Sequence, residues 1–322
     1  MTSNDEIEEI SSMESEYQWL LQEEVHNVLK ELKEMLHECG KRFRTQATEN
    51  NIDAIKAEKF VLQSANGSDQ VRGIITLQGD RISKADLTLR LHRNAGSVLK
   101  TSIREDIPWR LQQVQDAGNH LQTAVEQVSI KDIDYEFQSG EEVSQLMDEV
   151  MCSLHHGRQC LLNPSKESLP DIYRNKSTHL LNPPLPPEAM LNFFIHCNKL
   201  VMIAYYIHQI PASKSAHHRR VNIENQQSSL RMMPLMASTI GQDAYWHSSI
   251  QRPQPLGTHH KQVSTFEVGS SRFEVTSQYL VESVVPWLSE TLMYFTVALQ
   301  TCQELKNKID VFAPYQEAKQ EH

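Results

Sequence analysis

The sequence predicts an α+β protein: an antiparallel four-helix bundle domain joined to an antiparallel β-sheet domain with a covering helix, elongated overall. Long segments whose apolar residues recur every three or four positions predict the helices, and shorter alternating segments between turns predict the strands. The order of the two kinds along the chain predicts separate helical and sheet domains rather than a doubly wound sheet. With 322 residues, of which 39% are hydrophobic and 22% charged, the chain is long enough for one large domain or two modest ones.

The first predicted helix covers residues 14–44 and carries an apolar stripe wide enough to be buried in a bundle. We expect Ser11 or Ser12 to cap it, and the acidic residues 1–13 before it to be disordered. This stretch also lacks the apolar core of a signal or transit peptide. The stripe consists of Tyr17, Leu20, Leu21, Val25, Val28, Leu29, Leu32, Met35, Leu36 and Cys39.

Three further helices follow from apolar spacing and from helix-start residues. One is predicted over residues 111–128, as the cover for the apolar face of the sheet. Another begins after Ser139, whose hydroxyl forms a capping box with Glu142. The last is predicted over residues 281–309, with Pro286 tolerated near its first turn.

The remaining helix of the bundle is predicted to open after Pro186 and Pro187 and to run to Ile210, because Met190–Ile210 is apolar on nearly every side. This segment is long enough to cross a hydrocarbon layer of about 30 Å. However, His196, Asn198 and Lys199 fall in its middle, and a central lysine alone costs about 2.5–3.5 kcal/mol on insertion scales. The polar residues therefore favour a core helix over a membrane span.

The strands are predicted from alternation and from turn residues. Asn66-Gly67 supplies the positive φ of a tight hairpin turn between the first two strands, and the third strand alternates so that one face is buried. The predicted strands are Phe60–Leu62, Val71–Leu77, Ala85–Leu91, Val98–Ile103, Tyr135–Gln138 and Phe266–Val275, the last two as extensions of the sheet.

These elements imply two domains that are interleaved along the chain. The helical domain is predicted to consist of residues 14–45, 140–211 and 278–312, and the β domain of residues 57–138 and 263–277. Between them, Ala212–Gln262 holds six basic residues against Glu224 and Asp243, a net charge of +4, and no sustained periodicity. Disorder is predicted for residues 1–13, 212–262 and 313–322, the middle segment being a projecting insertion.

Composition and motifs exclude several classes of function. Thirty-one basic against 41 acidic residues give a formal charge of −10, which argues against general affinity for nucleic acid. The five cysteines are odd in number and form no Cys-x-x-Cys pair, so a reducing compartment is expected. The sequence holds no phosphate-binding loop, dinucleotide fingerprint, nucleophile elbow or His-Glu-x-x-His motif. We therefore expect no catalytic residue, cofactor or metal.

Two clusters have some features of metal sites. Asp132–Glu136 has the acidic residues of a calcium loop, but Phe137 stands where glycine is required, which favours a turn that leads into a strand. Zinc could be approached from one helix by Cys152, His155, His156 and Cys160. Because these residues spread over about two turns, buried cysteines beside surface histidines are favoured instead.

Two segments are candidate docking sites for partners. Overlapping Pro-x-x-Pro spacings around Pro183 and Pro186 can present a polyproline face, although prolines at a helix start explain the run without a partner. Within the insertion, an apolar island in a polar tract could fold into a partner's groove or contact its own domain loosely. The island consists of Leu230, Met232, Met233, Leu235 and Met236.

Several short motifs in these elements resemble the Rogdi family of leucine-zipper-type proteins. The motifs are Gln22–His26 with Val28–Lys30, Asp69–Gly73 with Thr76–Asp80, Leu111–Gln113 with Gln115–Ala117, Leu146–Asp148 with Val150–Met151, and Val285–Leu288 with Tyr294–Val297 and Gln300. The likeness covers residues 16–211 and 263–315, and the sequence departs from the pattern at Ala212–Gln262, where its insertion is longer than usual. The resemblance implies a helical bundle beside a β domain and a role without catalysis.

The resemblance also implies partners and a location. Rogdi-like proteins are similar to the smaller subunit of the RAVE-type (rabconnectin) assembly, which helps to reattach the V1 sector of the vacuolar-type proton pump to its membrane sector. The implied partners are a large WD-repeat (rabconnectin or DmX-like) protein and the V1 sector. The implied location is cytoplasmic and peripheral to vesicles, with a neuronal and presynaptic role in animals, or at the nucleus or nuclear envelope. The heptads alone leave open a self-associating, leucine-zipper-like structural protein with a nuclear or signalling role, for which dimerisation is expected.

Overall fold

The computed structural model describes the chain from residue 3 to residue 314, with several gaps. The described ranges are 3–43, 56–63, 70–90, 98–131, 135–163, 167–174, 177–211 and 264–314. The predicted hairpin turn at Asn66-Gly67 and the predicted insertion at residues 212–262 lie outside them. The chain divides into two compact units, Met1–Tyr206 with Ser277–His322, and Ile207–Thr276.

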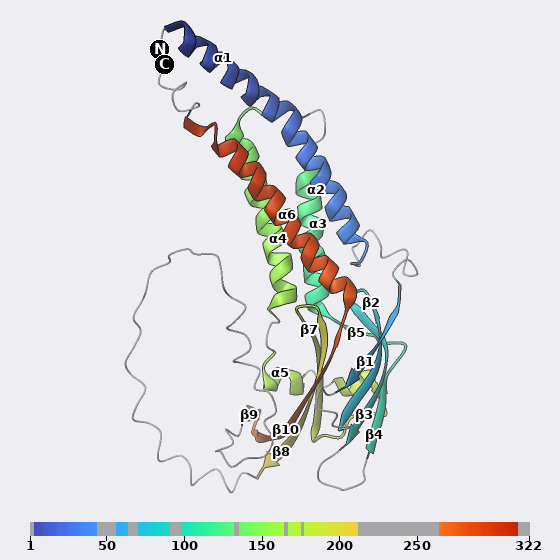
Figure 1. Ribbon diagram of the computed structural model, residues 1–322. Helices are drawn as coiled ribbons and strands as arrows, with labels where there is room; N and C mark the ends of the chain where they lie inside the picture. The colour runs from blue at the N-terminus through green and yellow to red at the C-terminus, as the bar shows by residue number, and fades with distance from the viewer. Residues whose placement is uncertain are drawn as a thin grey trace, which may run out of the picture. The chain divides into compact units, whose positions relative to one another are not determined.

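Long helices form one end of the first unit, which we call the helical part (Figure 1). Its members are α1 (Ser3–Trp19), a π-helical turn (Leu20–Glu24), α2 (Val25–Gly40), α3 (Gln112–Ile130), α4 (Gly140–Leu162) and α6 (Pro286–Asp310). Both α2 and α4 pack against α3 and α6, so these four helices surround one shared core. The predicted stripe on the first helix faces this core, where Val25, Leu32 and Leu36 are fully buried.

The strands form one ten-stranded sheet in the order β6-β4-β3-β2-β1-β10-β8-β7, with β5 paired to β3 and β9 to β10. The bounds are Glu58–Gln63 (β1), Val71–Gln78 (β2), Arg81–Arg90 (β3), Val98–Ile103 (β4), Trp109–Arg110 (β5), Leu181–Asn182 (β6), Ala189–His196 (β7), Lys199–Ile210 (β8), Thr265–Val268 (β9) and Ser271–Val284 (β10). Every strand pair with a defined register is antiparallel. The predicted mixture of helices with an antiparallel sheet is therefore confirmed.

The sheet curls on itself, because strands that are distant in its order meet on its inner face. The Phe193 ring in β7 packs edge-on against Trp109 in β5, with 5.1 Å between ring centroids. Leu62, Ile75 and Leu87, from three successive strands, are almost fully buried on the same face. The sheet thus has an enclosed inner face and an outer face on which the alternate side chains lie.

In the second unit, taken by itself, β9 and the first part of β10 form a hairpin. Gly269 has a φ of +61°, a conformation that glycine adopts without strain, and it lies in the connection between the two strands. The rings of Phe266 and Phe273 stack at 5.3 Å across the hairpin. The predicted strand around Gly269 is therefore confirmed as two strands.

The prediction of a helix that opens after Pro187 and runs to Ile210 is wrong, since this segment forms the β7–β8 hairpin. Its strands are buried on both faces, so their apolar runs show no alternation that would distinguish a strand from a core helix. The polar residues at the centre form the turn: His196 pairs with Lys199, and Cys197 between them has a φ of +57°. The bundle position that this helix was expected to fill is occupied by α3.

Other predicted elements differ in their position or bounds. The helix over residues 111–128 is present as α3, but it packs against α2 and α4 rather than serving as the expected cover of the sheet. The first helix begins at Ser3, not after Ser11 or Ser12, because glutamates favour the positive end of a helix dipole. Tyr135–Gln138 is not a strand; it leads into α4, and Phe137 packs against the ring of His26, 5.6 Å between centroids.

The last helix begins later than predicted, with Pro286 at its start. Proline is well suited to the first turn, where its missing N–H would have no helical partner. Val281, which the periodicity assigned to the helix, lies in β10. Ser139, in contrast, caps α4: its Oγ accepts a hydrogen bond from the Glu142 backbone N–H at 3.3 Å, the first half of the predicted capping box, while the Glu142 carboxylate accepts from the backbone N–H of Gln138.

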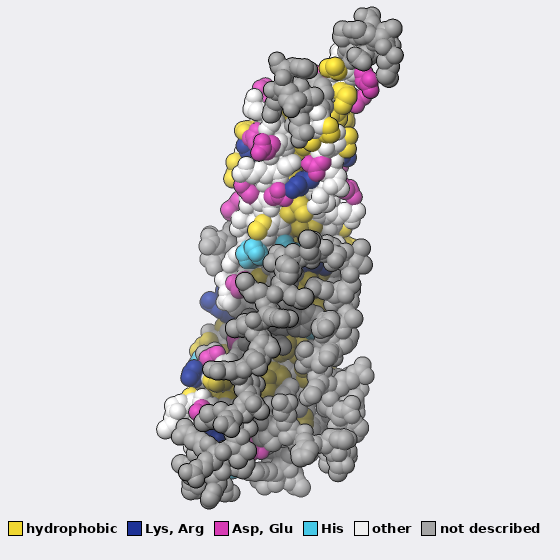
Figure 2. Space-filling view, turned by 90° about the vertical axis from the view of Figure 1, so that its left-hand side faces the viewer, with side chains coloured by type: hydrophobic (Ala, Val, Ile, Leu, Met, Phe, Trp, Pro, Cys, Tyr) yellow, Lys and Arg dark blue, Asp and Glu magenta, His cyan; other side chains and the backbone are white. Residues whose placement is uncertain are grey.

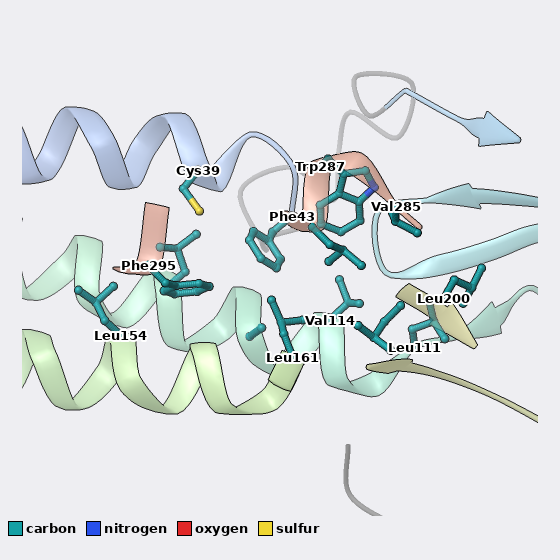
Figure 3. Close-up of a cluster of buried hydrophobic side chains, with 14 of the residues drawn as sticks. Cys39, Phe43, Leu111, Val114, Leu154, Leu161, Leu200, Val285, Trp287 and Phe295 are labelled. Carbon is teal, nitrogen blue, oxygen red and sulfur yellow. The ribbon is translucent and has the colours of Figure 1, made fainter. Parts of the chain in front are cut away.

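One continuous core joins the helical part to the sheet (Figure 3). Phe43 and Trp287 meet edge-on at 6.0 Å, between the buried helical residues and Val285 and Leu200 beside the sheet. The β7–β8 turn is fastened at the same place: Cys197 N–H donates to Leu161 O, and Val285 N–H donates to the carbonyl of Asn198, at 2.9 and 2.8 Å. The helices and the sheet of the first unit therefore share one packed junction.

Candidate interaction surfaces

Of the two predicted docking segments, the structure describes only the proline run around Pro183 and Pro186. The island Leu230, Met232, Met233, Leu235 and Met236 lies outside the described residues. Pro183 is exposed and follows a cis peptide bond, and its carbonyl accepts a hydrogen bond from Thr101 Oγ1 at 2.6 Å. Pro186 is half-buried, and its carbonyl accepts from Ala189 N–H. The proline run thus connects β6 to β7, and it does not start a helix.

The cysteines of the helical part have little nucleophilic character where they are buried. Desolvation raises the pKa of Cys39 to about 12, although a hydrogen bond with Thr291 opposes the shift, and burial raises the pKa of Cys302 to about 12 as well. A thiol attacks or binds metal as the thiolate, so neither group is poised for reaction near neutral pH.

The histidine and cysteine residues of α4 lie along its surface. Cys152 is exposed, and its Sγ lies 3.7 Å from Nδ1 of His156, whose ring is 5.4 Å from the ring of His120 in α3. Cys160 lies two turns away from Cys152 and is half-buried. Within the part of the chain that the structure describes, no three His, Cys, Asp or Glu side chains converge as a metal site.

A charged cluster at the start of α4 fastens the preceding loop. Lys131 Nζ lies 2.8 Å from Glu142 Oε1 and 3.6 Å from the centre of the Tyr135 ring, and the Tyr135 hydroxyl donates to the same carboxylate. The hydrogen bonds from Lys131 and Tyr135 hold the pKa of Glu142 below its ordinary range. The hydrogen bond to Glu142 in turn raises the pKa of Lys131. Each group is satisfied by its neighbours, so the cluster fixes local structure.

The surface of the helical part is acidic with a few exposed apolar side chains. Residues 1–38 hold eleven acidic residues against Lys30 and Lys33, a net charge of −9. Met293 and Val297, one turn apart on α6, are 57% and 41% exposed. On the face seen in Figure 2, Asp and Glu side chains outnumber Lys and Arg over the described helices. A partner of this surface would need basic groups.

The outer face of the sheet carries an apolar row across three strands. Val61 in β1 pairs directly with Ile74 in β2, and the pairing of Gln63 with Glu282 puts Val284, two residues further along β10, on the same face of the sheet. Val284, Val61 and Ile74 are 50%, 45% and 44% exposed, while their neighbours in sequence on β1 and β2 point into the core. Directly opposed side chains in a sheet are in contact, so Val61 and Ile74 form one patch, and Val284 lies on the same face of the neighbouring strand β10.

Basic side chains flank this row on both sides. Strands β1–β4 contain six basic residues against Glu58 and Asp86, a net charge of +4. On one side of the row, Lys59 in β1 and Lys84 in β3 both pair with Thr76 in β2. On the other side, Arg72 in β2 and Lys100 in β4 both pair with Thr88 in β3. Lys84 is paired with Glu105 at 2.8 Å. Lys59, Arg72 and Lys100 have no ion pair with any other residue that the structure describes.

The edge of the sheet at β7 is more fully covered. The edge strand β7 contacts α5 (Leu169–Arg174), and Asn192 Nδ2 donates to Glu167 just before this helix. The Gln113 side chain closes part of the same edge: its Oε1 accepts from Ile195 N–H at 2.9 Å and its Nε2 donates to Ile195 O at 3.1 Å. Strand addition at this end of β7 is therefore blocked, and the outer face of β10, β1 and β2 stays open, as does that of β3 and β4.

Sequence reasoning missed Val61, Ile74 and Val284 as candidate functional residues. A signal was present, because each is an apolar residue at a position where alternation expects a polar one. Their contact depends on strand register, and the register between β1 and β10 joins segments more than two hundred residues apart. Periodicity within one segment does not contain that information.

The segment that was weighed as a membrane span, Met190–Ile210, forms strands β7 and β8 and their turn. Among the helices that the structure describes, none combines the length and the apolar content needed to cross a bilayer.

The fold and these surfaces define a mixed protein whose long helices and curled antiparallel sheet share one core, with opposite charges on their open faces. The chain matches the family described as "Rogdi leucine zipper containing protein" over residues 16–310. It is 37% identical to the protein rogdi homolog of Homo sapiens over 303 residues, 94% of this chain and 93% of the relative. It is 29% identical to protein rogdi of Drosophila melanogaster over 317 residues, 98% and 94% of the two chains. The chain belongs to the Rogdi family.

Proposed function

We propose that the protein is a non-enzymatic scaffold or adaptor subunit of a RAVE-type (rabconnectin) complex that promotes assembly of the vacuolar-type proton pump. The observation that carries this proposal is the family match, which spans nearly the whole chain at 37% identity to the human relative. Its partners would be a large WD-repeat (DmX-like) protein and the V1 sector. It would act on the cytoplasmic side of vesicles, presynaptic ones in animals.

The chemistry of the described residues supports a binding role. Two of the buried thiols have a pKa of about 12, and the charged cluster at Glu142 is saturated by its own neighbours. The exposed apolar side chains lie instead on open surfaces of helix and sheet. Surfaces of this kind are typical of interaction sites.

The alternative is a self-associating leucine-zipper protein. The heptad residues Leu21, Val25, Leu32 and Cys39 are buried within the same chain, against the other helices of the core. This stripe therefore offers no seam to a second copy. A mass measurement in solution tests the alternative directly, and a stable dimer at micromolar concentration would favour it.

The adaptor proposal is tested by removing the protein and measuring pump assembly. In depleted cells we expect less V1 sector to sediment with membranes and a higher pH in acidic vesicles, read with a ratiometric probe, and re-expression should restore both. The tagged chain should co-purify with a WD-repeat protein and V1 subunits. Normal V1 attachment and normal acidification after depletion would contradict the proposal.

A further inference from the structure

We infer that the outer face of β10, β1 and β2 binds an acidic amphipathic helix of a partner protein. Val284, Val61 and Ile74 would receive its apolar side chains, and the flanking basic residues its carboxylates. The inference rests on the proposed adaptor function, and it adds where a partner binds and what chemistry that partner has.

The spacing of the apolar row fits a helical ligand. Neighbouring strands lie about 4.8 Å apart, so a row across three strands spans about 10 Å. Apolar residues at positions i, i+4 and i+7 of a helix span about 10.5 Å. Two turns of a helix can therefore set one apolar side chain beside each of Val284, Val61 and Ile74.

The charges select an acidic ligand. Lys59 lies on one side of the row, and Arg72 and Lys100 lie on the other, each without an ion pair among the described residues. Three branched side chains alone form a small patch, so most of the specificity must come from these charges. Complementary charges raise association rates and exclude wrong partners, and their effect weakens as salt increases.

The same face is a poor match for a membrane or a nucleic acid. Asp86 continues the row beyond Ile74, and Glu282, whose carboxylate is paired with Lys199, lies two residues from Val284 along β10. The formal charge of the chain is −10, which opposes approach to an extended anionic polymer or bilayer more strongly than approach to a short helix with a few carboxylates. The exposed apolar groups of the row are the short side chains of Val61, Ile74 and Val284, none of which is an aromatic anchor for the bilayer interface.

Photo-crosslinking in the full-length chain tests the inference. A benzophenone amino acid replaces Val61 in one version and Val297 on α6 in another, two valines of similar exposure. After irradiation in cells, mass spectrometry identifies the peptide that is joined to the probe. From position 61 we expect crosslinks to a single segment of a partner, and this segment should have a net negative charge and apolar residues at helical spacing. The same segment should not be crosslinked from position 297.

Charge reversal makes the test quantitative. Lys59→Glu with Arg72→Glu, in the chain with the probe at position 61, should lower the crosslinked yield about tenfold or more, because like charges then oppose the ligand. The matched control, Lys30→Glu with Lys33→Glu on exposed positions of α2, changes the net charge equally and should leave the yield within about twofold. Circular dichroism melts of all variants confirm that each is folded.

Four outcomes would overturn the inference: crosslinks to lipid, crosslinks to a second copy of this chain, crosslinks to a basic or neutral segment, or equal yields after both charge reversals. Absence of any product above that at position 297 would overturn it as well. These failures are separate from failure of the adaptor function. If depletion impairs acidification but the variants at Lys59 and Arg72 restore it fully, the adaptor function stands and the docking face is wrong.

Discussion

The helical part and the sheet use their apolar residues differently. In the helices the apolar stripes face one another, and what remains outside is mostly acidic, with a net charge of −9 over residues 1–38. The sheet buries one face and keeps Val61 in β1, Ile74 in β2 and Val284 in β10 on the other, and the net charge over strands β1–β4 is +4. One region has an acidic surface over an inward-facing stripe, and the other has a basic surface with an outward-facing row.

This difference separates the residues that stabilise the fold from those available for recognition. A helix with a single apolar stripe uses it for packing, so changes to the stripe act on stability. A strand offers two faces, so the sheet can contribute Leu62 to the core while its neighbour Val61 stays in solvent. Variants of the two regions should therefore have different effects, and the following predictions test that distinction.

The largest effect is expected for Phe295→Ala in α6. Phe295 is fully buried, and its ring lies against the backbone of Gly157 in α4. Removing the ring leaves a cavity where two helices meet, and we expect a loss of about 3–5 kcal/mol in the free energy of unfolding. Urea titration followed by circular dichroism measures this. Met293→Ala on the exposed side of the same helix is the control and should change stability by less than about 0.5 kcal/mol.

A smaller loss is expected where the helices meet the sheet. A Cβ on Gly118 would lie 3.1 Å from the Phe43 side chain, which packs against Trp287. Gly118→Val should therefore cost about 1–3 kcal/mol by overpacking. A Cβ on Gly40 would meet no neighbouring atom within 4 Å, so Gly40→Ala is the control and should not destabilise. If both variants unfold at the same urea concentration, the junction is not tightly packed.

An intermediate effect is expected at the start of α4. Ser139→Ala removes the acceptor for the Glu142 N–H and should cost about 1 kcal/mol in the free energy of unfolding. Ser144→Ala, one turn inside the same helix, removes a hydroxyl without removing a cap and should be nearly neutral. Equal losses in thermal melts of the two variants would show that the cap contributes nothing.

Much of the fold could be predicted where one segment carries its own periodic signal. The stripe from Tyr17 to Cys39, the cap at Ser139 and the alternation in residues 85–91 each predict an element that the structure contains. These signals are local, because a helix or a half-buried strand repeats its environment every few residues. Segments of this kind account for α2, α3, α4 and the strands β1–β4.

Prediction failed where burial on both faces removed the repeat. Residues 189–210 are apolar on nearly every side because β7 and β8 are covered on both faces, and the pattern is the same as that of a core helix. The positive φ at Cys197 gave no sequence signal, since cysteine is not typical of that conformation. Because the apolar pattern predicts the segment up to Ile210 as the fourth helix of the bundle, the helix over residues 111–128 is expected on the face of the sheet, whereas α3 packs against α2 and α4.

A pH dependence is expected from the cluster at Glu142. Lys131 and Tyr135 hold the pKa of this carboxyl below its ordinary range, so the folded state favours the ionised form. The resulting stabilisation is present above the unfolded-state pKa of about 4.3 and is lost as the pH falls through the lower folded-state value. The stability advantage of the native chain over Glu142→Gln should therefore shrink between about pH 6 and about pH 3. If the difference in the free energy of unfolding between the native chain and Glu142→Gln stays constant over this pH range, the carboxyl of Glu142 is not the source of the pH dependence.

The smallest effect on stability is expected for the outer face of the sheet. Val61→Thr with Ile74→Thr keeps β-branched side chains in both strands and replaces a methyl group and an ethyl group on half-exposed residues by hydroxyls, so the free energy of unfolding should change by about 0.5 kcal/mol or less. Leu62→Ala, one residue away on the buried face, should cost about 2–5 kcal/mol. Chemical denaturation of the two variants measures how much the outer and the buried face of the sheet each contribute to the free energy of unfolding. A large loss from the threonine pair would mean that Val61 and Ile74 are needed for folding, and the sheet would then resemble the helices in using its apolar residues for stability.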